Sequence, residues 1–295
     1  SGISANDSCI IYSTGDSGQK QTLNFCNPPD VQIAPGKNHV IEMTNNFIGV
    51  WNKSDILSNK SLLEESKANN PIYWTNNFFK INPKNDTFDP SIIYDSTSHR
   101  WFSTLVEFEI PHGDESRKSD KMGMILSYSA PDNYKRWTVM KFSPRLILPT
   151  ETSYYCPDRP MIYASTDKVL ISMTISDPVD KQCSEENKST RYLLMAIFNK
   201  TQLFDDTYMK KDFDVMYVYD RNYHYVPVKS NSERAEIDLV NISPYADTNL
   251  RLTYLKISGS LDKLSKELYE RDLAYKKSIP PNAVQKGTNT KLYIA

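Results

Sequence analysis

A short pattern occurs three times in this chain, and it limits the possible folds more than any other feature of the sequence. In each copy an Asp comes just before an alternating apolar run, a polar turn follows, and a second apolar run begins after the turn. The three Asp residues, Asp30, Asp89 and Asp158, are 59 and 69 positions apart. Strand units that repeat at this spacing are typical of a β-propeller built from four-stranded antiparallel blades. We therefore expect an all-β propeller.

The repeats also predict how the chain is divided. We expect an N-terminal strand and a disulfide loop over 1–29 and propeller blades over 30–295. The predicted blades are 30–87, 88–157, 158–224 and 225–287, and 288–295 reads as the first strand of a further blade. About five blades are thus begun.

A propeller must close on itself to cover its edge strands. We therefore expect the 288–295 strand to pair with missing blades, supplied by the same polypeptide or by a second subunit. The alternative is that an N-terminal strand near 9–12 closes the ring within the chain.

The segment 260–277 is compatible with two structures. Leu261, Leu264 and Leu268 have helical spacing after a possible Ser260 cap, whereas the apolar positions near 268–275 would also suit an outer strand. The sequence leaves both open.

Charge and hydropathy exclude two kinds of partner. The chain has 35 basic and 36 acidic residues, a net charge of −1, and no long run of either sign. Nucleic-acid binding needs a basic surface that replaces phosphate counterions, so nucleic acid is not an expected partner. No apolar stretch reaches the roughly 20 residues that span a bilayer, so we expect no membrane span in this chain.

The four cysteines form two local couples in the sequence, Cys9 with Cys26 and Cys156 with Cys183. Neither couple has the spacing of a zinc site. Four thiols allow three pairings, and we favour the local disulfides because each couple brackets a hairpin-sized loop. The alternative is four buried free thiols in a cytosolic protein.

Seven Asn-x-Ser/Thr sequons are candidates for N-glycosylation. They are Asn6, Asn52, Asn59, Asn85, Asn187, Asn199 and Asn241. All but Asn6 and Asn241 lie in turn-like polar segments, and Asn241 is a poor acceptor because Pro244 follows its sequon. The sequons and cysteine couples together predict an extracellular or cell-surface glycoprotein. The start at Ser1, with Cys9 soon after, suggests that a signal segment has been removed.

The chain carries no nucleophile elbow, zinc-protease helix, phosphate loop or dinucleotide fingerprint. The best candidate site is the trio Asp30, Asp89 and Asp158, which should gather near the mouth of the central channel if the repeats superpose. Three readings are open. Backbone N–H groups of adjacent blades satisfy the carboxylates, the trio binds a hard cation such as Ca²⁺, or the carboxylates catalyse glycoside hydrolysis.

Tryptophans have two expected roles. Trp51, Trp101 and Trp137 occupy repeat-equivalent strand or corner positions, which favours blade packing. Trp74 lies in an aromatic segment that we expect to be a connecting loop, so we predict that it makes a binding or assembly contact.

The segment 28–45 with Val50–Lys53 resembles the opening blade of secreted bacterial and archaeal sialidase-like β-propellers, most of unassigned function. The segment 89–95 with Arg100–Phe102 is similar to their second blade, and 129–132 with Trp137 resembles a degenerate Asp-box corner. The segments 200–203, 257–259 and 285–288 resemble the later blade junctions of this family, so the resemblance covers nearly the whole chain. These motifs imply architecture, and the family's further blades imply that more strands complete the ring.

The chain departs from related enzymes at the positions that matter for catalysis. Five-bladed glycoside hydrolases normally use a Glu acid in a third blade, where this chain has Asp158. Sialidases use three converging Arg and a Tyr nucleophile. Arg100, Arg159 and Arg191 are present here, but Arg100 falls within the packing pattern.

We therefore predict an extracellular or cell-surface glycosylated β-propeller that acts as a binding or structural module, in adhesion or assembly. Its expected partner is a protein or a glycan at the cell surface. The alternative is a glycoside hydrolase, sialidase-like or five-bladed, that uses Asp30, Asp89 and Asp158 as axial carboxylates.

Overall fold

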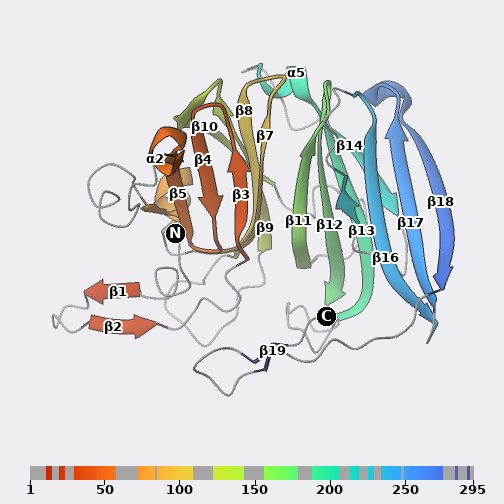
Figure 1. Cartoon of the computed structure of the whole chain (residues 1–295), viewed down its shortest axis with the longest axis horizontal. Helices are drawn as coiled ribbons and strands as arrows, with labels where there is room; N and C mark the ends of the chain where they lie inside the picture. The colour runs from red at the N-terminus through yellow and green to blue at the C-terminus, as the bar shows by residue number, and fades with distance from the viewer. Residues whose placement is uncertain are drawn as a thin grey trace.

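The computed structural model describes most of the repeated core of this 295-residue chain. The described residues are 11–14, 20–23, 30–57, 72–83, 85–108, 122–142, 156–178, 188–205, 213–218, 225–228, 234–246, 249–274, 283–284 and 291–292. They form an all-β propeller with four four-stranded antiparallel blades, which lie side by side (Figure 1). The predicted fold class is confirmed.

Each blade is a meander of strands that are consecutive in the chain. Blade 1 contains β3 (Gln32–Pro35), β4 (His39–Met43), β5 (Phe47–Asn52) and β6 (Ile72–Trp74). Blade 2 contains β7 (Asp86–Asp95), β8 (Arg100–Phe108), β9 (Met122–Ala130) and β10 (Asn133–Phe142). Blade 3 contains β11 (Cys156–Ala164), β12 (Lys168–Pro178), β13 (Lys188–Asn199) and β14 (Phe213–Val218). Blade 4 contains β15 (Val226–Pro227), β16 (Ile237–Ala246), β17 (Asn249–Ser258) and β18 (Ser265–Ala274).

Short helical turns connect some of these strands. They are α2 (Lys53–Leu57), α4 (Thr75–Phe79), α5 (Lys200–Leu203) and the 3₁₀ turn η3 (Leu261–Lys263). Asn199 caps α5, because its side-chain oxygen accepts the Thr201 and Gln202 amides. No helix among the described residues is long and apolar enough to cross a bilayer.

Two small hairpins lie outside the blades. β1 (Ile11–Thr14) pairs with β2 (Lys20–Leu23), and β19 (Ala283–Val284) pairs with β20 (Lys291–Leu292). The described part of the 288–295 segment therefore finds a partner inside the chain. Ring closure by pairing this segment with a strand near 9–12 does not occur among the described residues. The predicted source of further blades stays a prediction.

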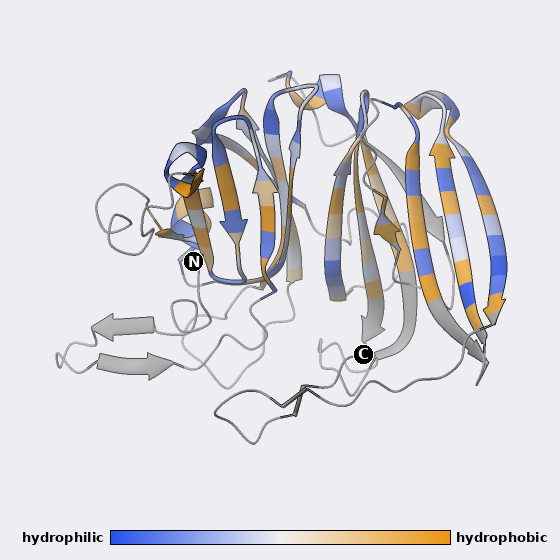
Figure 2. Ribbon diagram, in the orientation of Figure 1, coloured by the Kyte–Doolittle hydropathy of each residue, from blue (hydrophilic) through white to orange (hydrophobic). Residues whose placement is uncertain are grey.

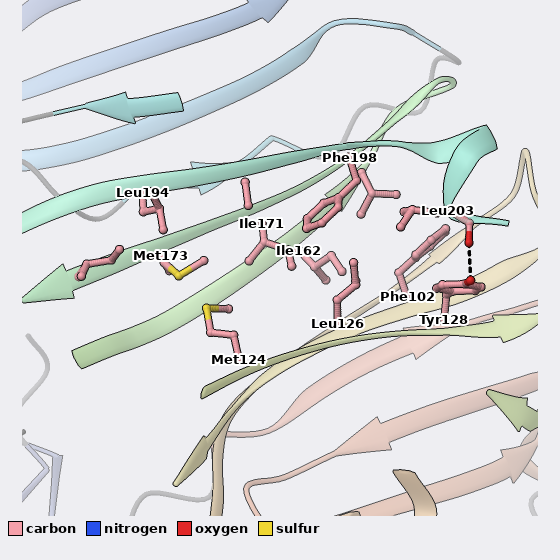
Figure 3. Close-up of a cluster of buried hydrophobic side chains, with 13 residues drawn as sticks. Phe102, Met124, Leu126, Tyr128, Ile162, Ile171, Met173, Leu194, Phe198 and Leu203 are labelled. Atoms are coloured by element: carbon pink, nitrogen blue, oxygen red, sulfur yellow. Dashed lines mark hydrogen bonds between the residues drawn. The ribbon is translucent and has the colours of Figure 1, made fainter. Parts of the chain in front are cut away.

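The cores form where the faces of neighbouring blades meet. Apolar residues are frequent along the strands (Figure 2), and central strands such as β8 and β9 are buried at nearly every position because both of their faces are covered. Between blades 2 and 3, Phe102, Met124 and Leu126 face a second set of buried side chains (Figure 3). That set is Ile162, Ile171, Met173, Leu194 and Phe198. The Tyr128 hydroxyl closes this core by donating a hydrogen bond to the Leu203 carbonyl.

Trp101 joins blade 1 to blade 2. Its ring is fully buried, and its Nε1 donates to the Ala34 carbonyl at 3.2 Å. Trp51 is also buried and donates to Glu42, and Trp137 packs against the same core as Trp101. The expected packing role of these three tryptophans is confirmed.

The structure argues against glycans at two of the predicted sequons. Asn85 is 6% exposed and donates from Nδ2 to Glu107 at 2.7 Å, and Asn241 is 5% exposed within β16. A glycan attached to either amide would have to fit inside the packed fold. Burial therefore disfavours these two sites, and glycosylation of all seven sequons stays a prediction. Asn52 is exposed and Asn199 half-buried, while Asn6, Asn59 and Asn187 lie outside the described residues.

Cys156 is buried at the start of β11 and is disulfide-bonded. Cys9, Cys26 and Cys183 lie outside the described residues. The pairings Cys9–Cys26 and Cys156–Cys183 therefore stay predictions.

Candidate functional site

Near the start of the innermost strand, three blades have a non-glycine residue in the left-handed backbone conformation. Asp30, Asp89 and Arg159 have φ angles of 44°, 51° and 49°, in the left-handed region that non-glycine residues seldom adopt. In blades 2 and 3 this residue lies in a bulge, at the register shifts between Phe88 and Ser91 and between Asp158 and Met161. A bulge redirects the side chain that it carries, and such bulges often occur near functional sites.

The bulges show that the predicted alignment of the second and third repeats, which matched Asp158 to Asp89, was wrong by one residue. The residue equivalent to Asp89 is Arg159, and each of these two is followed by a proline, Pro90 or Pro160. Asp158 is one position earlier, in the place of Phe88. The third repeat thus presents Arg where the first two present Asp. The matching prolines were the sequence signal for this alignment.

A continuous chain of hydrogen bonds nevertheless links the three blades at this point. Asn45 donates from Nδ2 to Asp30 Oδ2 at 3.0 Å and accepts the Asp89 amide on Oδ1 at 2.9 Å. Asp89 Oδ2 then accepts the Arg159 amide at 3.0 Å. Sequence reasoning missed Asn45, which lies in the β4–β5 turn and bridges blades 1 and 2.

Burial and the carboxyl groups of Asp158 and Asp30 raise the pKa of Asp89. Burial raises the pKa of Asp89 to about 6, and the nearby charges of Asp158 and Asp30 and a hydrogen bond with Asp158 add to this rise. The Arg159 amide opposes the rise, because it stabilises the charged form. Asp30, Asp89 and Asp158 are therefore close enough to interact. We call these three residues with Asn45 and Arg159 the axial cluster.

The geometry of the axial cluster fits some chemistries better than others. Retaining glycosidases hold their two carboxyl groups about 5 Å apart and inverting ones further apart, so that a sugar or a water fits between them. Asp89 and Asp158 are instead hydrogen-bonded to each other. Among the described residues, no group of three or more His, Cys, Asp or Glu side chains is arranged to hold a metal ion. Nothing in the cluster therefore adds to the Ca²⁺ prediction.

A small cavity lies beside the axial cluster, between the inner strands of blades 3 and 4. Its volume is about 150 Å³. It is lined by Arg159, Met161, Ser172, Met173, Thr174, Leu193, Tyr225 and Val226. Arg159 thus belongs to both features: its amide is in the axial cluster, and the residue also lines the cavity.

Trp74 occupies a strand rather than the predicted loop. It is the last residue of β6, the outer strand of blade 1, where it pairs with Phe47. Its ring is 4.5 Å from that of Phe47 and the residue is 37% exposed. The predicted loop position of Trp74 was wrong, because Ile72–Trp74 form the outer strand of blade 1. The predicted binding role of Trp74 stays a prediction.

No protein-family model matches this chain, and no curated protein matches it. One solved structure that resembles it is an alpha-L-arabinofuranosidase from Lactobacillus brevis, with a TM-score of 0.41 and 13% sequence identity. The alignment covers 81% of this chain and 71% of that chain. This likeness concerns the arrangement of strands and does not extend to chemistry.

Proposed function

We propose that this chain is an extracellular or cell-surface glycosylated β-propeller that acts as a binding or structural module, in adhesion or assembly. Its partner is a protein or a glycan at the cell surface. The observation that carries this proposal is the hydrogen bond from the Arg159 amide to Asp89 Oδ2. This bond gives the central carboxylate a structural task, which is to hold the inner strand of blade 3 against that of blade 2.

The remaining contacts of the axial cluster support the same role. Asn45 is bonded to both Asp30 and the Asp89 backbone, and the Thr87 hydroxyl donates to the Asn45 carbonyl at 2.7 Å. Each bond joins one blade to another or to its own turn. A cluster used in this way stabilises the inner strands and leaves recognition to the exposed surface, where Trp74 offers an aromatic contact.

Two experiments test this proposal. Mass spectrometry of the native protein should find glycans, and a glycan array or surface-protein panel should show binding that Trp74→Ala weakens. Trp137→Phe, a change at a largely packed tryptophan, serves as the matched control. Unmodified native protein, or binding that Trp74→Ala leaves unchanged, would count against the proposal.

A glycoside hydrolase is the second candidate, and one observation favours it. Because its pKa is about 6, Asp89 keeps its proton to a higher pH than an ordinary Asp, and a minor fraction of molecules is still protonated at neutral pH. A general acid needs this property. In such an enzyme Asp89 would protonate the leaving oxygen, and Asp30 would be the remaining carboxylate.

Turnover separates the two candidates. The protein would be incubated with a panel of aryl glycosides, including an α-L-arabinofuranoside and a sialoside. The binding module predicts no hydrolysis above that of Asp89→Asn. Hydrolysis that Asp89→Asn abolishes, while the protein stays folded and Glu267→Gln is fully active, would establish the enzyme instead.

A further inference from the structure

Arg159 faces two blades at once. Its amide donates to Asp89 of blade 2, and the residue lines the cavity between β11, β12, β13 and β15. The left-handed backbone of Arg159 sets this arrangement, since the bulge turns the side chain out of the regular alternation of β11. The strand itself therefore places Arg159 at the cavity.

The other cavity walls are mainly apolar. Met161, Met173, Leu193, Tyr225 and Val226 supply them. The two hydroxyl residues add little polar character. Ser172 donates to the Tyr225 carbonyl at 3.4 Å, and Thr174 is 3% exposed and has a partner of its own. A cavity of this volume with apolar walls accepts a group about the size of benzene.

The Arg159 guanidinium has no hydrogen bond or ion pair with any other described residue, and the residue is exposed. A guanidinium binds a carboxylate through two parallel hydrogen bonds, more specifically than an ammonium does. One charged group beside an otherwise apolar cavity is the usual layout of a small-molecule site. We propose that this cavity binds a small organic carboxylate, with its apolar body inside and its carboxylate on Arg159.

Asp89 and Asp158 limit the affinity. Both lie on the amide side of Arg159, and their negative charge opposes the approach of an anion. The cavity is also small, so few ligand atoms can make contact. We therefore expect dissociation constants on the order of millimolar for probes of this size.

Three probes separate the parts of the site. Benzoate carries both the ring and the carboxylate, benzamide keeps the ring without the charge, and acetate keeps the charge without the ring. Ligand-observed NMR titration of the full chain should show benzoate binding at least about tenfold more tightly than the other two. Arg159→Gln should weaken benzoate to the level of benzamide, and Arg136→Gln, at an exposed Arg on β10, should change nothing.

Val226→Phe provides an independent variant, because a larger side chain at this half-exposed wall fills the cavity without touching the guanidinium. It should abolish benzoate binding while circular dichroism stays unchanged. Benzoate binding that keeps its wild-type affinity in Arg159→Gln, or that persists in Val226→Phe, would overturn the proposal. So would equal binding of benzoate and benzamide, or no saturable benzoate binding. None of these outcomes depends on whether the chain acts in adhesion or in glycoside hydrolysis.

Discussion

The Asp89 carboxylate and the Arg159 backbone amide are hydrogen-bonded at 3.0 Å across the boundary between blades 2 and 3. Both residues have left-handed backbones in equivalent bulges, and their bond orients the inner strand of blade 3 against that of blade 2. The bond joins residues 70 positions apart, which makes it a tertiary contact rather than a local one.

Asp89 should make stability depend on pH. Its pKa is about 6 in the folded state against 3.8 for an unperturbed Asp. At pH values between 3.8 and 6, Asp89 is therefore protonated in more of the folded molecules than of the unfolded ones. The stabilising contribution is thus complete below pH 3.8 and is lost as the pH rises through 6. Asp89→Asn removes this titration. The free energy of unfolding of the variant relative to wild type should rise by about 1–2 kcal/mol from pH 4 to pH 7, after allowance for solvent screening.

Urea unfolding at several pH values would measure this difference. Glu267→Gln on the exposed strand β18 is the control and should show no such trend. A pH-independent difference for Asp89→Asn would mean that Asp89 does not hold the extra proton.

Lys200 should be critical for joining blades 2 and 3. Its Nζ lies 2.8 Å from Asp95 Oδ2 and 2.6 Å from the Ser165 carbonyl, and both side chains of the ion pair are 6% exposed. Burial acts to raise the pKa of Asp95, but hydrogen bonds from Lys200, Ser98 and Thr97 outweigh it and the pKa is lowered. Lys200→Met should lower the free energy of unfolding by about 3–5 kcal/mol, because it leaves the buried Asp95 carboxylate without its partner.

Denaturant unfolding at pH 7 measures the cost of Lys200→Met. The destabilisation should shrink as the pH falls from 3.8 through the lowered pKa of Asp95, because protonation of Asp95 removes the ion pair from the wild type as well. Arg251→Met removes the half-buried partner of the exposed Asp272 and should cost less than about 1 kcal/mol. Similar costs for the two variants would contradict the buried role of Lys200.

Gly36 should not tolerate a side chain. A Cβ atom there would lie 2.0 Å from Cζ2 of the buried Trp101 ring. Gly36→Ala should therefore cost about 1–3 kcal/mol through overpacking. The cost should fall in a Trp101→Phe background, where the clashing atom is absent, and a double-mutant cycle of melting experiments would detect the coupling. Equal costs in both backgrounds would place the clash elsewhere.

Burial should decide which sequons carry glycans. In a host that performs N-glycosylation, Asn52 should be modified, and Asn85 and Asn241 should not, because the folded chain packs around them. Site-resolved peptide mass spectrometry would measure the occupancy. A glycan at Asn85 would be incompatible with its contact to Glu107.

Much of the fold could be predicted because apolar runs bounded by polar turns mark buried strands. The runs at 91–94 and 100–108 became the first two strands of blade 2, and Trp101 packs against blade 1 as expected. By contrast, 260–277 has both helical and strand periodicity. Most of it became β18, because each residue from Ser265 to Ala274 could pair with β17.

The candidate site was predictable only in part. The sequence indicated that Asp30, Asp89 and Asp158 gather, and their electrostatic coupling agrees with this. It could not place Asn45 beside them, since that contact with Asp89 spans 44 residues. It also aligned Asp158 with Asp89, although a bulge gives that position to Arg159.

The sequence by itself therefore determined the strand repeats, the apolar faces and the location of the acidic residues near the blade starts. All of these depend on local alternation and on burial, which the order of residues encodes directly. Only the tertiary structure decided which residue occupies each bulge, which amide reaches Asp89, and that Arg159 lines a cavity against blade 4. A register shift of one residue reverses the direction of a side chain, and that shift is set by pairing and packing between segments far apart in the chain.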